Sequence, residues 1–514
     1  MESPYKERFE ALLDWAYNHG ASLHPLLEVY QDEKTGFSLR VKPSAAGWLR
    51  SPFKAVTCPT SITLSYLNAL ADGPITPSPT TPAPNTQNPA FPERFMNSLP
   101  PHVIGRFYLI QQYLKGKSSY WAPYISTLTD PSQLDKWALP PFWAEDDIEL
   151  LKGTNAYIAI QEIQDNVKSE YKQARKMLKK EGFPDYRAYT EVLYNWAYCM
   201  FTSRSFRPSL ILSESAREYV VRLLPEGAKI DDFSILQPLY DIGNHSLEAE
   251  YTWNLTSEPS ACELTCRDSY EPGEQVFNNY GNKTNSELLL GYGFIIEPHD
   301  IYEDGDCPIG CLGPDAHGGW SPHNDYIHVR KRQQQGDNQD KGGEPQDFLI
   351  ARESFWEGYD AFVSRMGPNF SPNALHHQPQ FDHWDGRLLN DMVSMMASPE
   401  QWELFKELPQ YCAGNGPLGE DLDPLVDKLK ATLAQKIERD FVEFSCGRPN
   451  GGGEWEPVTE RQDLVKRYRD GYEAVFVNVL KKFEYSDEEI MALKAAAQEE
   501  EGDEDEDEEM EDGN

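Results

Sequence analysis

Three short segments concentrate the side chains of this chain that can hydrogen-bond to a ligand or take part in chemistry. They are Asp241–Ser246, Asn278–Asn285 and Gly291–Phe294, and they supply carboxylate, carboxamide, imidazole and phenol groups. Each segment alone is a weak signal, because Asn-His and Tyr-Gly pairs are common. A single histidine such as His245 is usually a hydrogen-bonded structural residue. The information therefore lies in the order and spacing of the three segments.

The cysteines suggest a competing chemistry. Three residues separate Cys262 from Cys266, and three separate Cys307 from Cys311, and structural zinc sites use such spacings. The first pair, however, shares one face of a stretch that alternates with period two, which predicts a half-buried strand rather than a compact zinc turn. We expect no metal. Eight cysteines in 514 residues indicate reduced thiols rather than a disulfide framework.

Hydrophobic periodicity predicts the elements that must position these segments. Apolar residues at steps of three and four predict a helix before Gly20, a mainly helical block from about residue 106 to 199, and two helices near the C-terminus. Asp423 and Pro424 would cap and begin the first C-terminal helix. The four predicted apolar stripes are Phe9, Leu12, Leu13 and Ala16; Ile160, Ile163, Val167, Tyr171, Ala174 and Leu178; Leu425, Leu429, Leu433, Ile437 and Phe441; and Leu464, Tyr468, Tyr472, Val475, Val479 and Phe483.

The charge of the chain limits its partners. The formal net charge is −37, and removing the 12 carboxylates of residues 499–514 leaves −25. Such a surface repels phosphate backbones and anionic lipids and attracts basic proteins. The acidic tail is either an electrostatic lure for a basic substrate or a solubilising disordered end. Because there is no signal-like segment and no run of 18 apolar residues, we expect a protein of the nucleus or cytoplasm that is not in a membrane. We also expect a monomer that does not bind nucleic acid directly.

Together with Ser203–Phe206 and Pro272–Val276, the three segments resemble the C-terminal half of the SET domain. More narrowly, the chain resembles the group that contains the plant ribulose-bisphosphate-carboxylase large-subunit lysine methyltransferase and fungal ribosomal-protein lysine methyltransferases. Tyr120–Tyr124 and Leu151–Thr154 resemble the helical insertion of this group. The resemblance implies an α+β fold, with a SET-domain β-fold, a knot-like C-terminal segment, a long helical insertion and an all-α C-terminal substrate-binding domain.

The resemblance also implies a division of the chain into parts. These are a SET domain at 8–299, containing a Pro-rich loop at 72–92 and the helical insertion at about 100–202; a connecting segment at 300–347 with a disordered insertion at 330–347; a helical substrate-binding-like domain at 348–495; and an acidic disordered tail at 496–514.

The implied activity is methyl transfer from S-adenosylmethionine to a lysine of a basic protein. The resemblance favours a ribosomal protein as the substrate over a histone. Tyr280 would be the catalytic phenol beside the methyl-transfer centre. Arg204 and Tyr292 would contact both the donor and the lysine channel. The residues implied to bind the donor are Gly36, Phe37, Ser38, Arg204, Asn244, His245, Tyr280 and Tyr292.

Several alternatives stay open at the level of sequence. The alternative for Tyr292 is a core aromatic that packs beside Phe294, and the alternative for Arg204 is a surface ion pair. Ser38 stands where the family usually has the second glycine of Gly-x-Gly; if that position needs positive φ, serine costs about 1 kcal/mol there. The same stretch also fits an ordinary turn. A histidine methyltransferase of the same fold and a non-catalytic protein-binding module are the competing functions.

Overall fold

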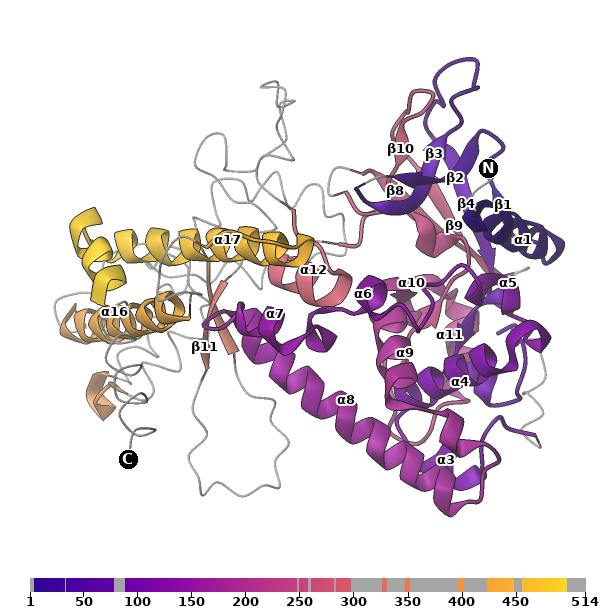
Figure 1. Ribbon diagram of the computed structural model, residues 1–514, viewed down its shortest axis with the longest axis horizontal. Coiled ribbons are helices and arrows are strands. Elements are labelled where there is room, and N and C mark those ends of the chain that lie inside the picture. The colour runs from indigo at the N-terminus through magenta and orange to yellow at the C-terminus, as the bar shows by residue number, and fades with distance from the viewer. Residues whose placement is uncertain are drawn as a thin grey trace. The chain divides into compact units, whose positions relative to one another are not determined.

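The structure of this protein is a computed structural model, shown in Figure 1. Two compact units divide the chain, one formed by Met1–Phe142 with Glu162–Asn282 and the other by Trp143–Gln161 with Lys283–Asn514. The predicted domain limits stay predictions. The expectations for the acidic tail, for most of residues 330–347 and 78–87, and for Cys307 and Cys311 lie outside the described residues. Those described are 4–32, 34–77, 88–246, 249–257, 260–281, 283–296, 326–330, 347–351, 396–401, 423–447 and 455–496.

Three small antiparallel sheets form the β part of the first unit. Their strand orders are β1-β4-β9-β8, β10-β3-β2 and β5-β7-β6. The strands are β1 (Ser22–Leu23), β2 (Leu27–Asp32), β3 (Gly36–Val41), β4 (Phe53–Pro59), β5 (Leu64–Ser65), β6 (Ser205–Phe206), β7 (Ile235–Leu236), β8 (Tyr251–Ser257), β9 (Ser260–Cys266) and β10 (Gln275–Val276).

Most helices of the first unit lie between β5 and β7 in the sequence, where a mainly helical block was predicted. Figure 1 shows α4 and α9 beside each other, and the two helices are in contact. The helices are α1 (Pro4–Asn18), α2 (Tyr66–Ala69), α3 (Glu93–Ser98), α4 (Pro101–Lys115), α5 (Ala122–Ile125), α6 (Leu134–Trp137), α9 (Glu191–Arg204), α10 (Pro208–Ile211) and α11 (Glu214–Val221), with 3-10 turns η1 (Thr60–Ile62), η2 (Gly116–Ser118), η3 (Pro140–Phe142), η4 (Tyr186–Ala188) and η5 (Tyr240–Ile242).

The two predicted stripes that bear on the first unit are confirmed. In α1, Phe9, Leu12 and Ala16 are buried and Leu13 is partly buried. Helix α8 (Asn155–Lys180) carries the other stripe, and all of its predicted residues are buried except Ile163, which is half-buried. No helix in the described part of the chain is long and apolar enough to cross a membrane.

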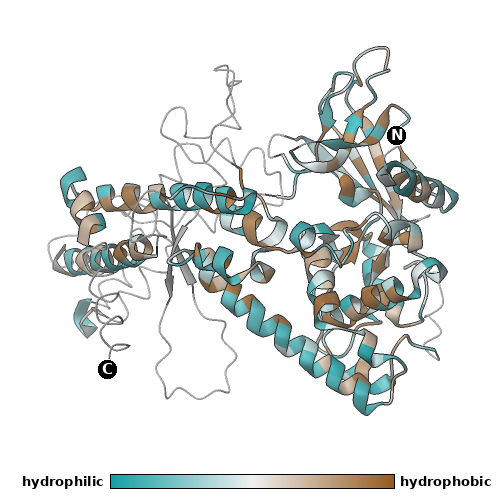
Figure 2. Cartoon of the chain, in the orientation of Figure 1, coloured by the Kyte–Doolittle hydropathy of each residue, from teal (hydrophilic) through white to brown (hydrophobic). Residues whose placement is uncertain are grey.

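The second unit contains the predicted C-terminal helices, α16 (Asp423–Cys446) and α17 (Glu460–Lys482). Figure 2 shows hydrophobic and hydrophilic residues alternating along both, as expected of amphipathic helices. The α16 stripe is buried as predicted. In α17 the buried face begins at Val465, whereas Leu464 is only half-buried. The sequence allowed either residue because both lie one turn before Tyr468.

Three further elements of this unit are α7 (Glu145–Glu149), α12 (Asn285–Tyr292) and a two-stranded ladder. The ladder pairs β11 (Tyr326–Arg330) with β12 (Asp347–Ala351), so the ends of the predicted insertion, Arg330 and Asp347, are antiparallel partners. Residues 348–351, which we expected to begin an all-α domain, are therefore a strand. Alternating polar and apolar residues are few in this short stretch, so its pairing comes from the partner strand rather than from a periodic signal.

A buried arginine joins distant parts of the second unit. The Arg469 guanidinium on α17 is 5% exposed and donates to the carbonyls of Leu150, at 3.0 Å, and Phe444, at 2.7 Å. Gly153 lies at the same junction with φ +78°, and a Cβ there would come within 2.5 Å of the Phe444 Cα. The backbones approach so closely that only glycine fits at position 153.

This close approach predicts opposite effects for two Gly-to-Ala changes in the same unit. Gly153→Ala should destabilise by about 2–4 kcal/mol, because it adds a positive-φ penalty to a backbone clash. Gly471→Ala should stabilise by about 1 kcal/mol, because Gly471 lies inside α17 with no atom within 4 Å of its missing Cβ. Denaturant unfolding, with hydrogen exchange of the α17 amides, measures both. Changes of the same sign would contradict the packing.

Candidate functional site

Two segments far apart in the sequence run side by side in the first unit. His245 forms a parallel bridge with Asn278. The Asn278 amide donates to the Asn244 carbonyl at 2.7 Å, and the Ser246 amide donates to the Asn278 carbonyl at 2.9 Å. Backbone hydrogen bonds therefore fix the register between the Asn-His pair and the loop that leads to Tyr280.

Tyr280 is bound to the first segment at three points. Its amide donates to His245 Nδ1 at 3.1 Å, and its phenol donates to the Gly243 carbonyl at 2.9 Å. Its ring stacks on the His245 imidazole, with centroids 5.0 Å apart and planes 14° from parallel. The Tyr251 phenol supports the same loop by donating to the Asn279 carbonyl at 2.9 Å. The half-buried Tyr280 hydroxyl therefore has a fixed position relative to Gly243–His245.

The Asn244 carboxamide faces the turn between β2 and β3. Its Nδ2 donates to Gln275 Oε1 at 2.9 Å and lies 3.5 Å from the Thr35 carbonyl. Asp32 closes this turn by accepting from the Thr35 amide at 2.8 Å, and Gly36 follows with φ +76°. The turn that holds Gly36 thus lies beside Asn244. Sequence analysis missed Gln275, although it lies in the Pro272–Val276 segment.

The condition behind the Ser38 expectation is not met. Ser38 lies within extended strand β3, opposite Tyr30, and does not have positive φ. The positive-φ residue of this stretch is Gly36. Ser38 therefore carries none of the backbone strain we considered, and its side chain is completely buried. Phe37 points to the core side, where its ring packs on Phe9 with centroids 4.6 Å apart.

Arg204, at the end of α9, forms an ion pair with the buried Asp241. Its Nη1 lies 3.6 Å from Asp241 Oδ2 and donates to the Asp241 carbonyl at 3.3 Å. The same carboxylate oxygen accepts from the Tyr124 phenol at 2.8 Å. The Asp241 side chain is 2% exposed and that of Arg204 is 32% exposed, so this ion pair is largely buried rather than a surface pair. Sequence analysis missed Tyr124, although it ends the Tyr120–Tyr124 motif.

Burial sets the protonation behaviour of this group. Removal from water raises the pKa of the Asp241 carboxyl, and the Arg204 charge and the Tyr124 hydrogen bond act in the opposite direction. Burial and the neighbouring Asp241 also raise the pKa of the Tyr124 phenol well above its usual value. The phenol therefore acts as a donor to the carboxylate over the physiological range.

Several buried polar atoms near these segments have no hydrogen-bond partner within the residues that the structure describes, and two of them bear on a ligand. These two are Asn278 Nδ2 and Ser38 Oγ, on side chains that are 1% and 0% exposed. Gly243 lies against the first of them, because a Cβ at Gly243 would be 3.5 Å from the Asn278 Cβ. Buried polar atoms left in this state normally bond to water or to a ligand.

Tyr292 lies in the second unit, at the end of α12. The capping box of Thr284 and Glu287 begins this helix, and Gly293 ends it with φ +81°. The Tyr292 ring packs on Phe294, with centroids 6.2 Å apart. The role of Tyr292 beside the donor stays a prediction.

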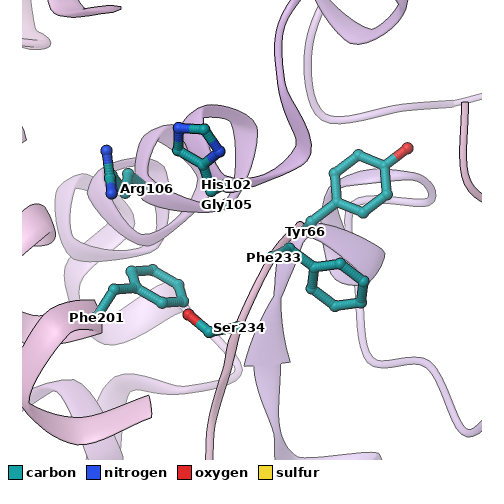
Figure 3. Close-up of a pocket in the computed structure, with 7 residues that line it drawn as sticks. All are labelled: Tyr66, His102, Gly105, Arg106, Phe201, Phe233 and Ser234. Atoms are coloured by element: carbon teal, nitrogen blue, oxygen red, sulfur yellow. The ribbon is translucent and has the colours of Figure 1, made fainter. Parts of the chain in front are cut away.

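Two other places were candidates for a ligand. Cys262 and Cys266 lie on β9 and face the core, where burial raises the pKa of each thiol to about 12. Figure 3 shows a small cavity between α2, α4 and α9. Its volume of about 20 Å³ has room for a water molecule but not for a nucleoside. The cavity is lined by Tyr66, His102, Gly105, Arg106, Phe201, Phe233 and Ser234.

Comparison with known proteins gives sequence relatives, although no family model matches the chain. The ribosomal lysine N-methyltransferase set10 of Schizosaccharomyces pombe is 30% identical over 290 residues, which are 56% of this chain and 46% of that protein. The protein-lysine N-methyltransferase EFM1 of Saccharomyces cerevisiae is 23% identical over 55% of this chain and 48% of its own length. The actin-histidine N-methyltransferase of Gallus gallus is 23% identical over 56% of this chain and 42% of its own length. The chain spans less than half the length of these relatives.

Solved structures cover nearly the whole chain. The SET domain of LSMT bound to lysine and AdoHcy aligns with a TM-score of 0.57 and 15% identity, over 95% of this chain and 93% of that one. Rubisco LSMT bound to AdoMet aligns with a TM-score of 0.55 and 16% identity, over 96% of this chain and 93% of that one. The predicted α+β fold is thus confirmed. The chain therefore has the fold of these SET-domain structures, and in sequence it is similar to proteins named as lysine and histidine methyltransferases.

Proposed function

We propose that this protein transfers a methyl group from S-adenosylmethionine to a lysine side chain of a protein. The observation that carries the proposal is the attachment of Tyr280 to Gly243 and His245 through its hydroxyl, its amide and its ring. Such an attachment holds one phenol in one place, and positioning is the main catalytic device in a direct methyl transfer. The names of the lysine-methylating relatives and the AdoMet-bound structures support the reaction class.

The residues present fit the donor. Its ammonium, carboxylate, ribose and adenine groups need hydrogen-bond partners in a buried site, and Asn278 Nδ2 and Ser38 Oγ are buried polar atoms without partners among the described residues. Asn244 and His245 pair with the backbone of Asn278, and Gly36 lies two residues before Ser38 in β3. When bound, S-adenosylmethionine supplies an electrophilic methyl group on a sulfonium sulfur.

The side chains of the protein would supply positioning. Lysine in water has a pKa of about 10.4, so the site must favour the neutral amine before attack. The Tyr280 hydroxyl would orient that amine and stabilise the charge that develops during transfer, while Arg204 would line the channel. Exclusion of water would prevent competing reactions.

The proposed substrate is a basic protein, with a ribosomal protein as the first choice. The net charge of −37 favours encounter with a basic partner, and the set10 relative is named for ribosomal lysine methylation. Histidine methylation is the second candidate, because a relative is named as an actin-histidine methyltransferase. The alternative of a non-catalytic module loses its main argument, since Ser38 is unstrained in β3.

Tyr280→Phe tests the catalytic role. The change keeps the ring and its stacking on His245 but removes the hydroxyl, so single-turnover methyl transfer should fall about 10²-fold while donor affinity changes little. Labelled S-adenosylmethionine would be the donor, and a proteome that lacks this protein would provide the acceptor. A melting curve would report folding. Wild-type rates in the variant would remove Tyr280 from the mechanism. A lower melting temperature with unchanged activity per folded molecule would indicate a structural role.

Asn244→Ala tests the donor site. Calorimetry should show S-adenosylmethionine binding to the wild-type protein and binding about 10–100-fold weaker in the variant, the effect of about 1–3 kcal/mol of lost hydrogen bonding. Asn254→Ala is the matched control, because Asn254 on β8 is exposed and its Nδ2 bonds only to Thr265 Oγ1 among the contacts described. Wild-type protein that binds no donor would refute the proposed function in favour of a binding module.

A further inference from the structure

The carboxylate of Asp241 is held by groups from three separate elements of the first unit. Asp241 itself lies in η5, Arg204 ends α9, and Tyr124 lies in α5 of the helical insertion. Tyr124 is 1% exposed, and its phenol makes the shorter of the two contacts with Oδ2, at 2.8 Å against 3.6 Å for Arg204 Nη1. A buried carboxylate requires such partners, since an unpaired one is strongly destabilising.

This carboxylate stands at the start of the segment that holds Tyr280. The Gly243 carbonyl and the His245 imidazole, two and four residues later, accept the hydrogen bonds from Tyr280. Arg204 also donates to the backbone carbonyl of Asp241, so the ion pair fixes main chain as well as side chain. The far end of the segment is fixed by Asn278, and the near end by the Arg204 and Tyr124 contacts.

The backbone just before Asp241 is strained. Leu239 has φ +68°, a conformation that a non-glycine residue adopts at a cost and keeps only when its surroundings impose it. Leu239 is 1% exposed, and η5 packs against β3 and β4. A strained residue two positions before a carboxylate held by three elements indicates that the surrounding elements impose the position of residues 241–245.

We propose that Tyr124 is a positioning residue for methyl transfer, whose phenol keeps the Asp241 carboxylate against Arg204 and thereby fixes the Gly243–His245 segment to which Tyr280 is bound. The inference rests on the proposed function and extends it, because it gives the helical insertion a direct part in the site. Tyr124 contacts neither Tyr280 nor His245 in any described hydrogen bond; it acts through Asp241.

The titration of Asp241 supplies a signature that simple loss of stability would not. The Tyr124 hydrogen bond lowers the pKa of a carboxyl that burial raises. Removing the phenol therefore raises that pKa further, and Asp241 becomes protonated at a higher pH. A neutral Asp241 no longer pairs with Arg204, so activity should be lost at a higher pH on the acid side. Among the described residues, the buried Cys58 and the charged Arg204 also interact with this cluster, and Cys262 interacts with Cys58.

The experiment compares Tyr124→Phe with Tyr171→Phe. Tyr171 is a buried tyrosine of the same unit, and its phenol donates to the Tyr189 carbonyl at 3.2 Å, away from the Asp241 cluster. Both variants lose one buried hydrogen bond, so both should melt about 2–4 °C lower. Only Tyr124→Phe should lose about tenfold in single-turnover rate at neutral pH and move the acid limb of the pH-rate profile to higher pH. Because the same segment carries Asn244, donor affinity should weaken in Tyr124→Phe and stay at the wild-type value in Tyr171→Phe.

Asp241→Asn separates positioning from stability. The pKa of Asp241 is raised in the folded state, so folding stability falls as pH rises above the pKa of the unfolded state and the buried carboxyl ionises. Asparagine at this position does not ionise and removes that cost at neutral pH. Asp241→Asn should therefore melt no lower than wild type at pH 7 yet transfer methyl at least tenfold more slowly. It should also lack the acid limb.

The outcomes are distinct. Wild-type rates and an unchanged pH profile in Tyr124→Phe would overturn the positioning role, as would an equal rate loss in Tyr171→Phe. A wild-type protein that transfers no methyl group to any protein would instead refute the proposed function itself. Alkaline pH gives the final check. If the rate falls because Asp241 becomes protonated and no longer pairs with Arg204, Tyr124→Phe should regain most of the wild-type rate at alkaline pH, where Asp241 is ionised.

Discussion

The hydrogen bonds between Tyr280 and the Gly243–His245 segment are the constraint on which the rest of the site depends. They join residues 35 to 37 positions apart, and the β8-β9 hairpin occupies the interval and returns the chain to the same place. The Asn278 backbone also pairs with this segment, at Asn244 and Ser246. A phenol attached at its hydroxyl, its amide and its ring loses little further freedom when a substrate arrives, and this is the physical meaning of a preorganised site.

A second constraint acts from the helical insertion. Burying the Asp241 carboxylate is unfavourable, and the cost is offset only because α5, α9 and η5 bring Tyr124 and Arg204 to the same oxygen. The insertion is therefore packed into the first unit as part of one continuous core, which runs from Phe9 through Phe107 to Val276. In this molecule a long insertion does more than separate the strands that precede and follow it.

The second unit depends on close backbone packing instead. Arg469 satisfies carbonyls from two distant stretches, and Gly153 allows those backbones to approach. Its core between α16 and α17 is separate from that of the first unit and is rich in aromatic contacts, such as Phe441 with Phe476. A helical pair with its own core can vary its surface without disturbing the core of the first unit.

The sequence by itself determined the elements and the order of the motifs. Periodicity identified the buried faces of α1, α8 and α16, because burial of one helix face depends on residues three and four apart. Resemblance placed Asn244, His245 and Tyr280 among the candidate site residues. Only the tertiary structure decided that Ser38 is extended and unstrained, that Gln275 holds Asn244, and that Tyr124 reaches Asp241 from 117 residues away. Such partners are set by how strands and helices cross in space, and no local pattern in the chain records that crossing.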